Sequence, residues 1–469
     1  MVTGAGMIAA VVAAACAASQ PQGPDPTATD GSAASVSVAT VRVQPDQAAL
    51  QPGQSFTFTA AAYDEAGDTL TASLVWEAHG GSVNSHGVYT APDGAGSFEV
   101  VARAGSGAAD SARVEVSSPP VASAPFVQSR FERLARGVNL TYWFSMGVWR
   151  PEYMSEADLV QLRQLGFTFV RLPILPGVIF DETDPGQLGP RIGELDRAVR
   201  LILDAGLAVV VDFHPEDDQF RTRLQSDDGF VAAVATFWKS LASHLSSYDP
   251  DSVFFEVLNE PQFSDANRWN RVARTLVAAV RQGAPAHTIV LSGPGCCQAE
   301  GLAGLTPLSD ANVIYTVHYY MPAAFTHQGA DWIGGSTYSG LHDLPYPSSP
   351  EACANVLPTI PDASLSLAQK YCEARWDSAK VQGDIDRIAS WSKSHGDVPV
   401  LVGEFGVYRA VAPARDRAHY LEDTRRALER DGLGWAMWDY AGGFGLMNVD
   451  SAGRSVDSLT AAALGLKGY

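Results

Sequence analysis

Two glutamates stand where acid–base chemistry would need them. Glu260 lies near the end of the segment Val253–Pro261 (VFFEVLNEP). Glu404 lies in the segment Val398–Gly406 (VPVLVGEFG). The apolar, β-prone run before each glutamate is typical of a buried strand, so each carboxylate is expected where a strand ends. Paired carboxylates serve as acid/base and nucleophile in the cleavage of glycosidic bonds. The pair therefore predicts a glycosidase that acts on a polysaccharide.

The elements that must position these glutamates alternate between helix and strand. Helical patterns end at Gly166, Gly206 and Gly432, because glycine readily terminates a helix. The first of these helices begins with a capping box, Ser155 and Asp158. The strand patterns are apolar on both faces, which is typical of a parallel sheet covered by helices. Eight such patterns occur: GVNLTYW (137–143), FTFVRLP (167–173), AVVVDFH (208–214), VFFEVLN (253–259), TIVLSG (288–293), VIYTVHY (313–319), PVLVGEF (399–405) and GWAMWDY (434–440).

Eight strand–helix units predict an α/β fold. We expect residues 128–469 to form a (β/α)8 TIM barrel, with the site at the carboxyl ends of its strands. The polar residues at those ends resemble, in type and in order, those of glycoside hydrolase family 5, the cellulase-like retaining glycosidases. The resemblance extends from Phe131 to Trp438. The residues that carry it are Arg171, His214, Asn259, Glu260, His318, Tyr320, Glu404 and Trp438.

The resemblance implies a double displacement in which Glu260 is the acid/base and Glu404 is the nucleophile. It also implies carboxyl groups ~5–5.5 Å apart and net retention of configuration. Glu260 must carry a proton before it can donate one, so we expect burial and the second carboxylate to raise its pKa. We expect Arg171 and Tyr320 to hydrogen-bond Glu404 and to lower the pKa of this nucleophile.

The resemblance further implies contacts with the substrate. Asn259 would bind the sugar 2-hydroxyl, and His214 would contact other hydroxyls. His318 would lie close to the acid/base, and Trp438 would form an aromatic floor beneath the sugar at the point of cleavage. No cofactor is implied, because water and two carboxyl groups suffice for the reaction.

Further candidates for sugar-binding subsites are Tyr142, Trp143 and Trp332, with ordinary packing at the rim as the alternative. A long insertion, residues 321–380, follows the sixth strand pattern. Long loops commonly form lids or binding walls, so we expect this insertion to shape the choice of substrate, although its fold is not predicted. The acidic residues between Glu216 and Asp228 are expected to form solvated surface.

Four cysteines in this part of the chain are disulfide candidates, with three pairings open: Cys296, Cys297, Cys353 and Cys372. Adjacent cysteines rarely bond to each other, so we favour Cys353 with Cys372. Their spacing matches no zinc motif, and no histidines cluster nearby, so we predict no metal site.

The N-terminal part of the chain is predicted to contain an export signal followed by a small β domain. Residues 1–18 contain a short Ala-rich apolar run, typical of an export signal. Cys16 follows three alanines, which resembles a lipidation signal, with simple cleavage as the alternative. Residues 19–37 are a predicted flexible linker, and residues 119–127 a Pro-rich one. Between them, the short strand patterns of residues 38–118 resemble a bacterial immunoglobulin-like sandwich.

Charge and composition narrow the class of partner. The 469 residues carry a formal net charge of −20, which repels phosphate backbones, so nucleic acid is not expected to bind. We predict an exported monomer without a transmembrane span, and we favour an endo-acting β-1,4-glucanase as its function. A mannanase, a xyloglucanase and an exopolysaccharide-specific glycosidase of the same family are the alternatives. From other classes, the alternatives are a non-catalytic surface glycan-binding protein and a structural adhesin.

Overall fold

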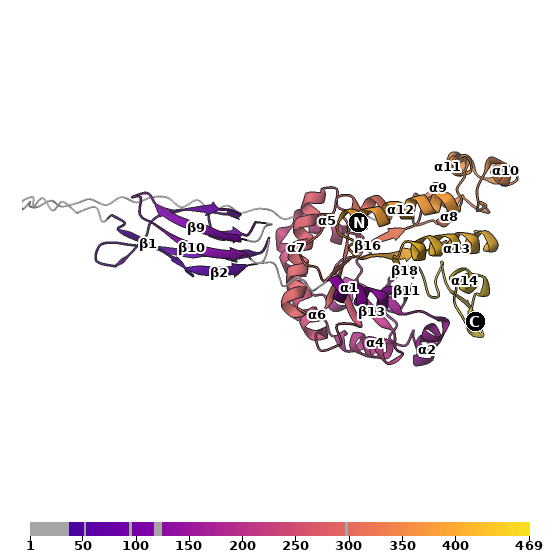
Figure 1. Cartoon of the computed structure of the whole chain (residues 1–469), viewed down its shortest axis with the longest axis horizontal. Coiled ribbons are helices and arrows are strands. Elements are labelled where there is room, and N and C mark those ends of the chain that lie inside the picture. The colour runs from indigo at the N-terminus through magenta and orange to yellow at the C-terminus, as the bar shows by residue number, and fades with distance from the viewer. Residues whose placement is uncertain (1–36, 51–52, 93–95, 117–123, 296–298) are drawn as a thin grey trace, which may run out of the picture.

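The computed structural model of the chain describes residues 37–50, 53–92, 96–116, 124–295 and 299–469 (Figure 1). Figure 1 shows a strand-rich part, drawn in indigo to purple, beside a larger part in which helices surround a barrel of strands. The predicted export signal, Cys16, Cys296 and Cys297 lie outside the described residues.

The strand-rich part has its own apolar core. Strand burial alternates along the elements, as in β1, where Val41 and Val43 are buried and their neighbours are exposed. Tyr89 and Val100 belong to the same core, and Trp76 packs against it. Its strands form three sheets: β1 (Thr40–Gln44), β4 (Thr59–Tyr63) and β5 (Thr69–Leu70); β2 (Gln47–Leu50), β10 (Ala109–Val116), β9 (Gly96–Ala104) and β6 (Leu74–His79); and β3 (Ser55–Thr57), β8 (Val88–Thr90) and β7 (Ser82–Val83).

The larger part contains a closed barrel of eight parallel strands, as predicted. All eight predicted strand patterns contribute one strand each, in chain order around the barrel. The strands are β11 (Arg136–Asn139), β12 (Phe169–Ile174), β13 (Ala208–Phe213), β14 (Val253–Glu256), β15 (Thr288–Ser292), β16 (Val313–Tyr319), β17 (Val400–Phe405) and β18 (Gly434–Met437). Phe169 and Ala208, the first residues of their strands, share a buried cluster with Phe131 of α1 (Ala124–Phe131). The helix α1 starts at Ala124, inside residues 119–127, the segment predicted as the second linker.

Helices cover the outside of the barrel. The capping box of Ser155 and Asp158 begins α2 (Glu156–Leu165), and Gly166 ends that helix in a left-handed conformation with φ 107°, both as predicted. The other long helices are α4 (Ile192–Asp204), α5 (Asp218–Ser226), α6 (Asp228–Leu245), α7 (Ala266–Gly283), α12 (Ser378–Ser394) and α13 (Ala414–Arg430). Shorter elements are η1 (Glu132–Leu134), α3 (Pro176–Ile179), η2 (Ala299–Leu302), β19 (Met447–Asp450), β20 (Gly453–Val456) and α14 (Ser458–Ala463). Among the described residues, no helix combines the length and apolar character that crossing a membrane requires.

The insertion between β16 and α12 folds into four short helical segments and one helix of 12 residues, α11. They are α8 (Ala323–Thr326), α9 (Ser336–Ser339), α10 (Pro350–Cys353), η3 (Leu357–Thr359) and α11 (Asp362–Glu373). The predicted disulfide between Cys353 and Cys372 joins α10 to α11 with an S–S distance of 2.01 Å. Phe325 packs against Tyr420 of α13, with ring centroids 5.6 Å apart. The insertion is thus a packed extension of the barrel.

Candidate active site

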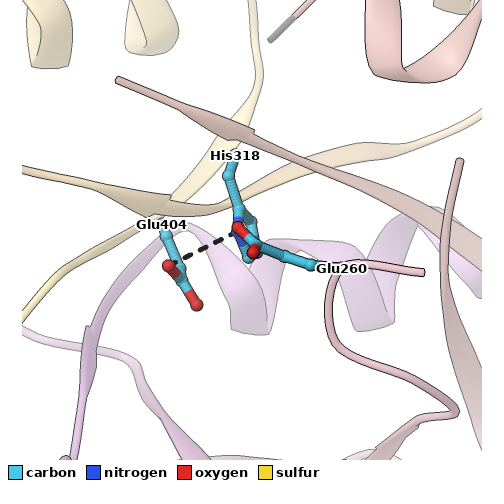
Figure 2. Close-up of side chains that lie close together, drawn as sticks. All are labelled: Glu260, His318 and Glu404. Carbon is cyan, nitrogen blue, oxygen red and sulfur yellow. Dashed lines mark hydrogen bonds and ion pairs between the residues drawn. The ribbon is translucent and has the colours of Figure 1, made fainter. Parts of the chain in front are cut away.

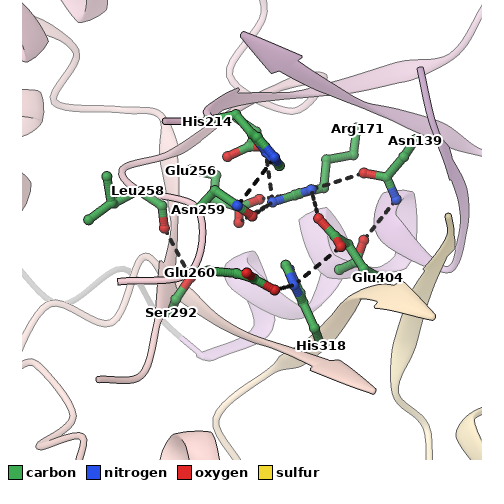
Figure 3. A network of polar contacts seen from close by, with 12 residues as sticks. Asn139, Arg171, His214, Glu256, Leu258, Asn259, Glu260, Ser292, His318 and Glu404 are labelled. Atoms are coloured by element: carbon green, nitrogen blue, oxygen red, sulfur yellow. Dashed lines mark hydrogen bonds and ion pairs between the residues drawn. The ribbon is translucent and has the colours of Figure 1, made fainter. Parts of the chain in front are cut away.

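Arg171 organises the centre of the site. It projects from β12, is fully buried, and lies among acceptors from several strands (Figure 3). Its Nη1 donates to Oε1 of Glu404 at 2.7 Å and to Oδ1 of Asn139 at 3.0 Å. Its Nη2 donates to Oδ1 of Asn259 at 2.9 Å. One guanidinium therefore fixes side chains from β11, β17 and the end of β14 relative to one another.

Two buried carboxylates near Arg171 were not predicted from the sequence. Glu256 accepts hydrogen bonds from Nε and Nη2 of Arg171, at 2.7 and 2.8 Å, in a bidentate ion pair. Asp212 lies 3.0 Å from Nη2 of the same guanidinium. A signal was present, because Glu256 lies four residues before Glu260 and Asp212 two before His214, which is the spacing of one strand face. A charged residue inside an otherwise apolar strand requires a buried partner.

His214 and Asn259 are held in defined orientations. Nδ1 of His214 lies 2.7 Å from Oδ2 of Asp212. An ionised carboxylate can only accept a hydrogen bond, so the imidazole beside it carries its proton on Nδ1. Nε2 of His214 then accepts from Nδ2 of Asn259 at 3.3 Å. Burial lowers the pKa of His214 to about 4. The neutral imidazole and Arg171 together fix which end of the Asn259 amide is the donor.

Glu260 and Glu404 face each other across His318 (Figure 2). Nδ1 of His318 is 2.8 Å from Oε1 of Glu260 and 3.4 Å from Oε2 of Glu404. One oxygen from each carboxylate and one nitrogen of His318 all lie within 4.8 Å of one another. The nearest oxygens of the two carboxylates are therefore no more than 4.8 Å apart, which is compatible with the ~5–5.5 Å between the carboxyl groups of retaining glycosidases.

Local backbone irregularities aim these side chains. The register between β16 and β17 shifts between Val317 and His318, and His318 then lies opposite Glu404. Such bulges commonly redirect side chains beside active sites. The backbone of Glu260 has φ 40°, a conformation that residues other than glycine rarely adopt. Tertiary contacts must hold this conformation in place.

Charge in this cluster is distributed differently from the prediction. Burial acts to raise the pKa of Glu260, but the hydrogen bond and the positive charge of His318 outweigh it and lower that pKa to about 2. Burial raises the pKa of Glu404, because His318 and Arg171 offset only part of the effect. The pKa of His318 is raised against the effect of burial, since both carboxylates face it. The predicted directions for the two glutamates are therefore wrong for the free site: His318 lowers the pKa of Glu260, and burial raises the pKa of Glu404.

Two further predicted residues complete the centre. The hydroxyl of Tyr320 donates to Oε2 of Glu404 at 3.0 Å, as expected. Trp438 follows β18 and lies parallel to the ring of His214, with centroids 5.8 Å apart. Tyr319, between His318 and Tyr320, points away from the site and donates to Asp384 of α12 at 3.1 Å.

The carboxylates open into a cleft of about 790 Å³. Tyr142 and Trp332 line this cleft, as the subsite prediction requires. Trp143 is only 1% exposed, so the prediction that it contacts sugar is wrong: its indole donates to the carbonyl of Pro151 and packs in the core. Glu216, expected on the solvated surface, also lines the cleft and accepts from the backbone of Gly147 at 3.0 Å.

The grouping of Glu260, His318 and Glu404 also has the composition of a metal site. Its geometry is accounted for without an ion, because Nδ1 of His318 lies within hydrogen-bonding distance of Glu260 and is close to Glu404 as well. A metal ligand would have to give up that proton.

Residues 130–443 match the family model described as Cellulase (glycosyl hydrolase family 5), which covers more than half of the chain. The chain belongs to glycosyl hydrolase family 5. The chain is 28% identical over 359 residues to Endoglucanase 3 of Fibrobacter succinogenes, a match that covers 72% of this chain and 54% of that protein. It is 25% identical over 315 residues to Endoglucanase C of Acetivibrio thermocellus, covering 65% of this chain and 90% of that protein. The chain thus spans about half the length of the Fibrobacter relative and most of the Acetivibrio one.

Solved structures share the fold of this family 5 enzyme. An endoglucanase of Thermotoga maritima aligns with a TM-score of 0.59 at 24% identity, over 72% of this chain and 99% of its own. A family 5 xyloglucanase of Bacteroides ovatus aligns with a TM-score of 0.59 at 16% identity, over 91% of this chain and 99% of its own. At these identities the likeness establishes the fold and leaves the substrate open.

Proposed function

We propose that the family 5 domain is an endo-acting β-1,4-glucanase that cleaves by double displacement. Glu404 is the nucleophile and Glu260 the acid/base. The single observation that carries the mechanism is the opposition of these two carboxylates across His318, with one oxygen of each within 4.8 Å of the other. The names of the relatives support the substrate, because Endoglucanase 3 and Endoglucanase C are both endoglucanases.

In the first step, an oxygen of Glu404 attacks the anomeric carbon of the sugar. The bond from that carbon to the leaving oxygen breaks, and Glu260 gives its proton to this oxygen. Arg171 and Tyr320 each donate a hydrogen bond to Glu404, which keeps the carboxylate ionised and oriented for attack. Asn259, held by Arg171 and His214, presents its remaining N–H to the sugar 2-hydroxyl.

In the second step, Glu260 accepts a proton from water. The oxygen of that water bonds to the anomeric carbon, and the bond to Glu404 breaks, which restores both carboxyl groups. Two inversions at one carbon give a product with retained configuration.

The proton that Glu260 donates is stored on His318 in the free site. Nδ1 of this imidazole lies 2.8 Å from Oε1 of Glu260. A sugar chain that enters the cleft displaces water, and a drier site favours the neutral pair over the ion pair. The proton therefore moves to Glu260 when substrate binds, which reconciles the low pKa of Glu260 in the free site with its role as an acid.

Activity of the full chain on a panel of polysaccharides tests this proposal. The panel contains carboxymethylcellulose, mixed-linkage β-glucan, xyloglucan, glucomannan, galactomannan and xylan. We expect release of reducing ends from the β-1,4-glucans and a fall of more than about 10³-fold in kcat for Glu404→Gln. Glu260→Ala should lose activity on polysaccharide but keep rapid release of a good leaving group from an aryl glycoside.

Glu132→Gln, a change at an exposed carboxylate of η1, is the matched control and should keep full activity. Activity on galactomannan or xylan alone would overturn the glucanase proposal and keep the mechanism. Near wild-type rates from Glu404→Gln would overturn the mechanism, and a folded protein silent on every substrate would favour a non-catalytic glycan-binding protein.

We also infer the organisation of the whole chain. Residues 1–18 direct export, residues 38–118 form an immunoglobulin-like spacer, and residues 128–469 are the catalytic domain. The separate apolar core of the strand-rich part supports the second assignment. The bacterial source of the two relatives is compatible with an exported enzyme.

A further inference from the structure

A second, much smaller cavity lies beside Glu260 and His318. Its volume of about 10 Å³, counted over the positions open to the centre of a water molecule, corresponds to a single water site. Ser292 of β15 and Thr316 of β16 line it, together with Glu260 and His318. Among the described residues that line the large cleft, only Glu260 also lines this cavity. The cavity therefore adjoins the acid/base without being part of the cleft.

The hydroxyl of Thr316 is buried in this cavity. Thr316 is 1% exposed, and its Oγ1 makes no hydrogen bond with the residues that the structure describes. A buried hydroxyl without a partner costs free energy, so such groups in folded proteins are generally paired, often with an ordered water. Thr316 thus indicates a small polar ligand, and the size of the cavity limits that ligand to one water.

The second ring nitrogen of His318 lies on the same side as this hydroxyl. A Cβ added to Gly403 would lie 2.8 Å from Oγ1 of Thr316 and 3.4 Å from Nε2 of His318, so both atoms flank the same point of β17. Nδ1 of His318 is instead directed at Oε1 of Glu260, 2.8 Å away. The imidazole therefore uses one nitrogen for Glu260 and has the other beside Thr316.

Ser292 supplies an acceptor to the cavity. Its hydroxyl donates to the carbonyl of Leu258 at 3.2 Å, which uses its only proton (Figure 3). The oxygen of Ser292 can still accept a hydrogen bond. A water in the cavity would thus have three polar partners, the number that buried waters usually have: Oγ1 of Thr316, Oγ of Ser292 and Nε2 of His318.

We propose that Thr316 and Ser292 bind one water in this cavity, and that this water accepts the Nε2 proton of His318. Thr316 is then a positioning residue for the acid/base. Because Nε2 keeps its proton, the proton on Nδ1 is the one that passes to Oε1 of Glu260. That transfer leaves a neutral imidazole and a neutral carboxyl group, so the pair neither gains nor loses a proton. The inference rests on the proposed function, since it concerns the proton that Glu260 gives to the leaving oxygen.

The water also supports the positive charge of His318. Burial acts to lower the pKa of His318, but Glu404 and Glu260 outweigh it and raise that pKa. Arg171 opposes the charge, and its own ion pairs with Asp212 and Glu256 lie behind it. An imidazolium has two N–H groups to satisfy, and hydrogen bonds from a charged donor are stronger than those between neutral groups. Loss of the acceptor at Nε2 would therefore favour the neutral ring.

Diffraction from crystals of the full chain tests the water directly. We expect density for one water within about 3.2 Å of both Oγ1 of Thr316 and Nε2 of His318. Thr316→Val keeps the shape of the side chain and removes its hydroxyl, so this variant should lack that water. A parent crystal that shows other buried waters but none at this position would overturn the proposal.

The pH profile of kcat/KM tests the effect on the acid/base. In Thr316→Val the charge on His318 is less favoured, so the pKa of Glu404, which burial raises and this charge lowers, should rise. Activity is lost as the pH falls through the pKa of Glu404, and it is lost again as the pH rises and the proton leaves the pair of His318 and Glu260. Both limbs should therefore move inwards, by about one pH unit each.

Two controls separate the hydroxyl from the packing of the side chain. Thr316→Ser restores the hydroxyl and should keep the profile of the parent. Thr424→Val removes a buried hydroxyl of α13 outside both cavities, and it should also keep that profile. Unchanged limbs in Thr316→Val would overturn the positioning role, and so would an equal shift in Thr316→Ser.

Failure of this inference is distinguishable from failure of the proposed function. A parent active on β-1,4-glucan whose limbs do not respond to Thr316→Val would overturn the water and leave the glucanase standing. If the parent released no reducing ends from any β-1,4-glucan, the proposed function would fail, and the diffraction experiment would still decide whether Thr316 binds the water.

Discussion

At the scale of residues, the proposed mechanism depends on how one cation and two carboxylates share a proton. The sequence predicts the types of the strand-end residues, because each follows an apolar run that ends at the same side of the barrel. It does not predict that His318 lies 2.8 Å from Glu260 and 3.4 Å from Glu404, since this proximity arises from the register shift between β16 and β17. His318 lowers the pKa of Glu260, whereas burial raises the pKa of Glu404, and both directions differ from the prediction.

The pH dependence of activity tests the role of His318. Its positive charge lowers the pKa of Glu404, so His318→Asn, which keeps a donor near Nδ1 but no charge, should raise that pKa. Glu404 attacks only when it is ionised, and activity is therefore lost as the pH falls through its pKa. The acid limb of the kcat/KM profile should accordingly move to higher pH in the variant. An unchanged limb, or one moved to lower pH, would show that His318 does not tune the nucleophile.

Glu256 and Asp212 illustrate a second limit at this scale. Glu256 is the last residue of β14, and Asp212 is the next-to-last residue of β13. A single acid within such an apolar run does not change the strand prediction, so neither residue was singled out. In space they surround Arg171, whose three ion pairs include Glu404. Arg171 therefore holds Glu404 through one hydrogen bond, while Glu256 and Asp212 hold Arg171. An inward-facing acid two or four residues before a catalytic residue on the same strand is the sign that would have revealed them.

At the scale of elements, the barrel was predictable and the insertion was not. Strands buried on both faces give continuous apolar runs, and glycine ends the helices between them, so local sequence suffices. Besides α11, the insertion contains α8, α9 and α10, each of four residues, which is too short for a helical period to appear in the sequence. Its order comes from distant contacts, such as Phe325 on Tyr420, and from the disulfide, which was predicted from the exclusion of adjacent cysteines.

The insertion also contributes side chains to the cleft. It supplies Trp332 and His327, whereas Tyr408 and Phe444 come from the segments after β17 and β18. Trp332, Tyr408 and Phe444, which line the cleft, therefore come from three connections at the carboxyl ends of neighbouring strands, where a TIM barrel places its variable binding residues.

At the scale of the whole molecule, the chain combines a strand-rich N-terminal part with the family 5 barrel. The net charge of −20 suits a neutral glycan and disfavours polyanions. If residues 1–18 direct export, the mass of the mature secreted protein should correspond to cleavage before residue 20. A lipid-modified Cys16 would add the mass of acyl chains to that N-terminus. An intact Met1 on protein recovered outside the cell would contradict both routes.

Trapping the covalent intermediate tests the central claim, which is that Glu404 attacks the sugar. An activated 2-deoxy-2-fluoro-cellobioside should inactivate the enzyme, because the fluorine slows both steps and the good leaving group restores the first. Mass spectrometry of the digested protein should then find the sugar on the peptide that contains Glu404, and Glu404→Gln should acquire no label. A label on Glu260, or an unlabelled enzyme that releases product with inverted configuration, would contradict the account.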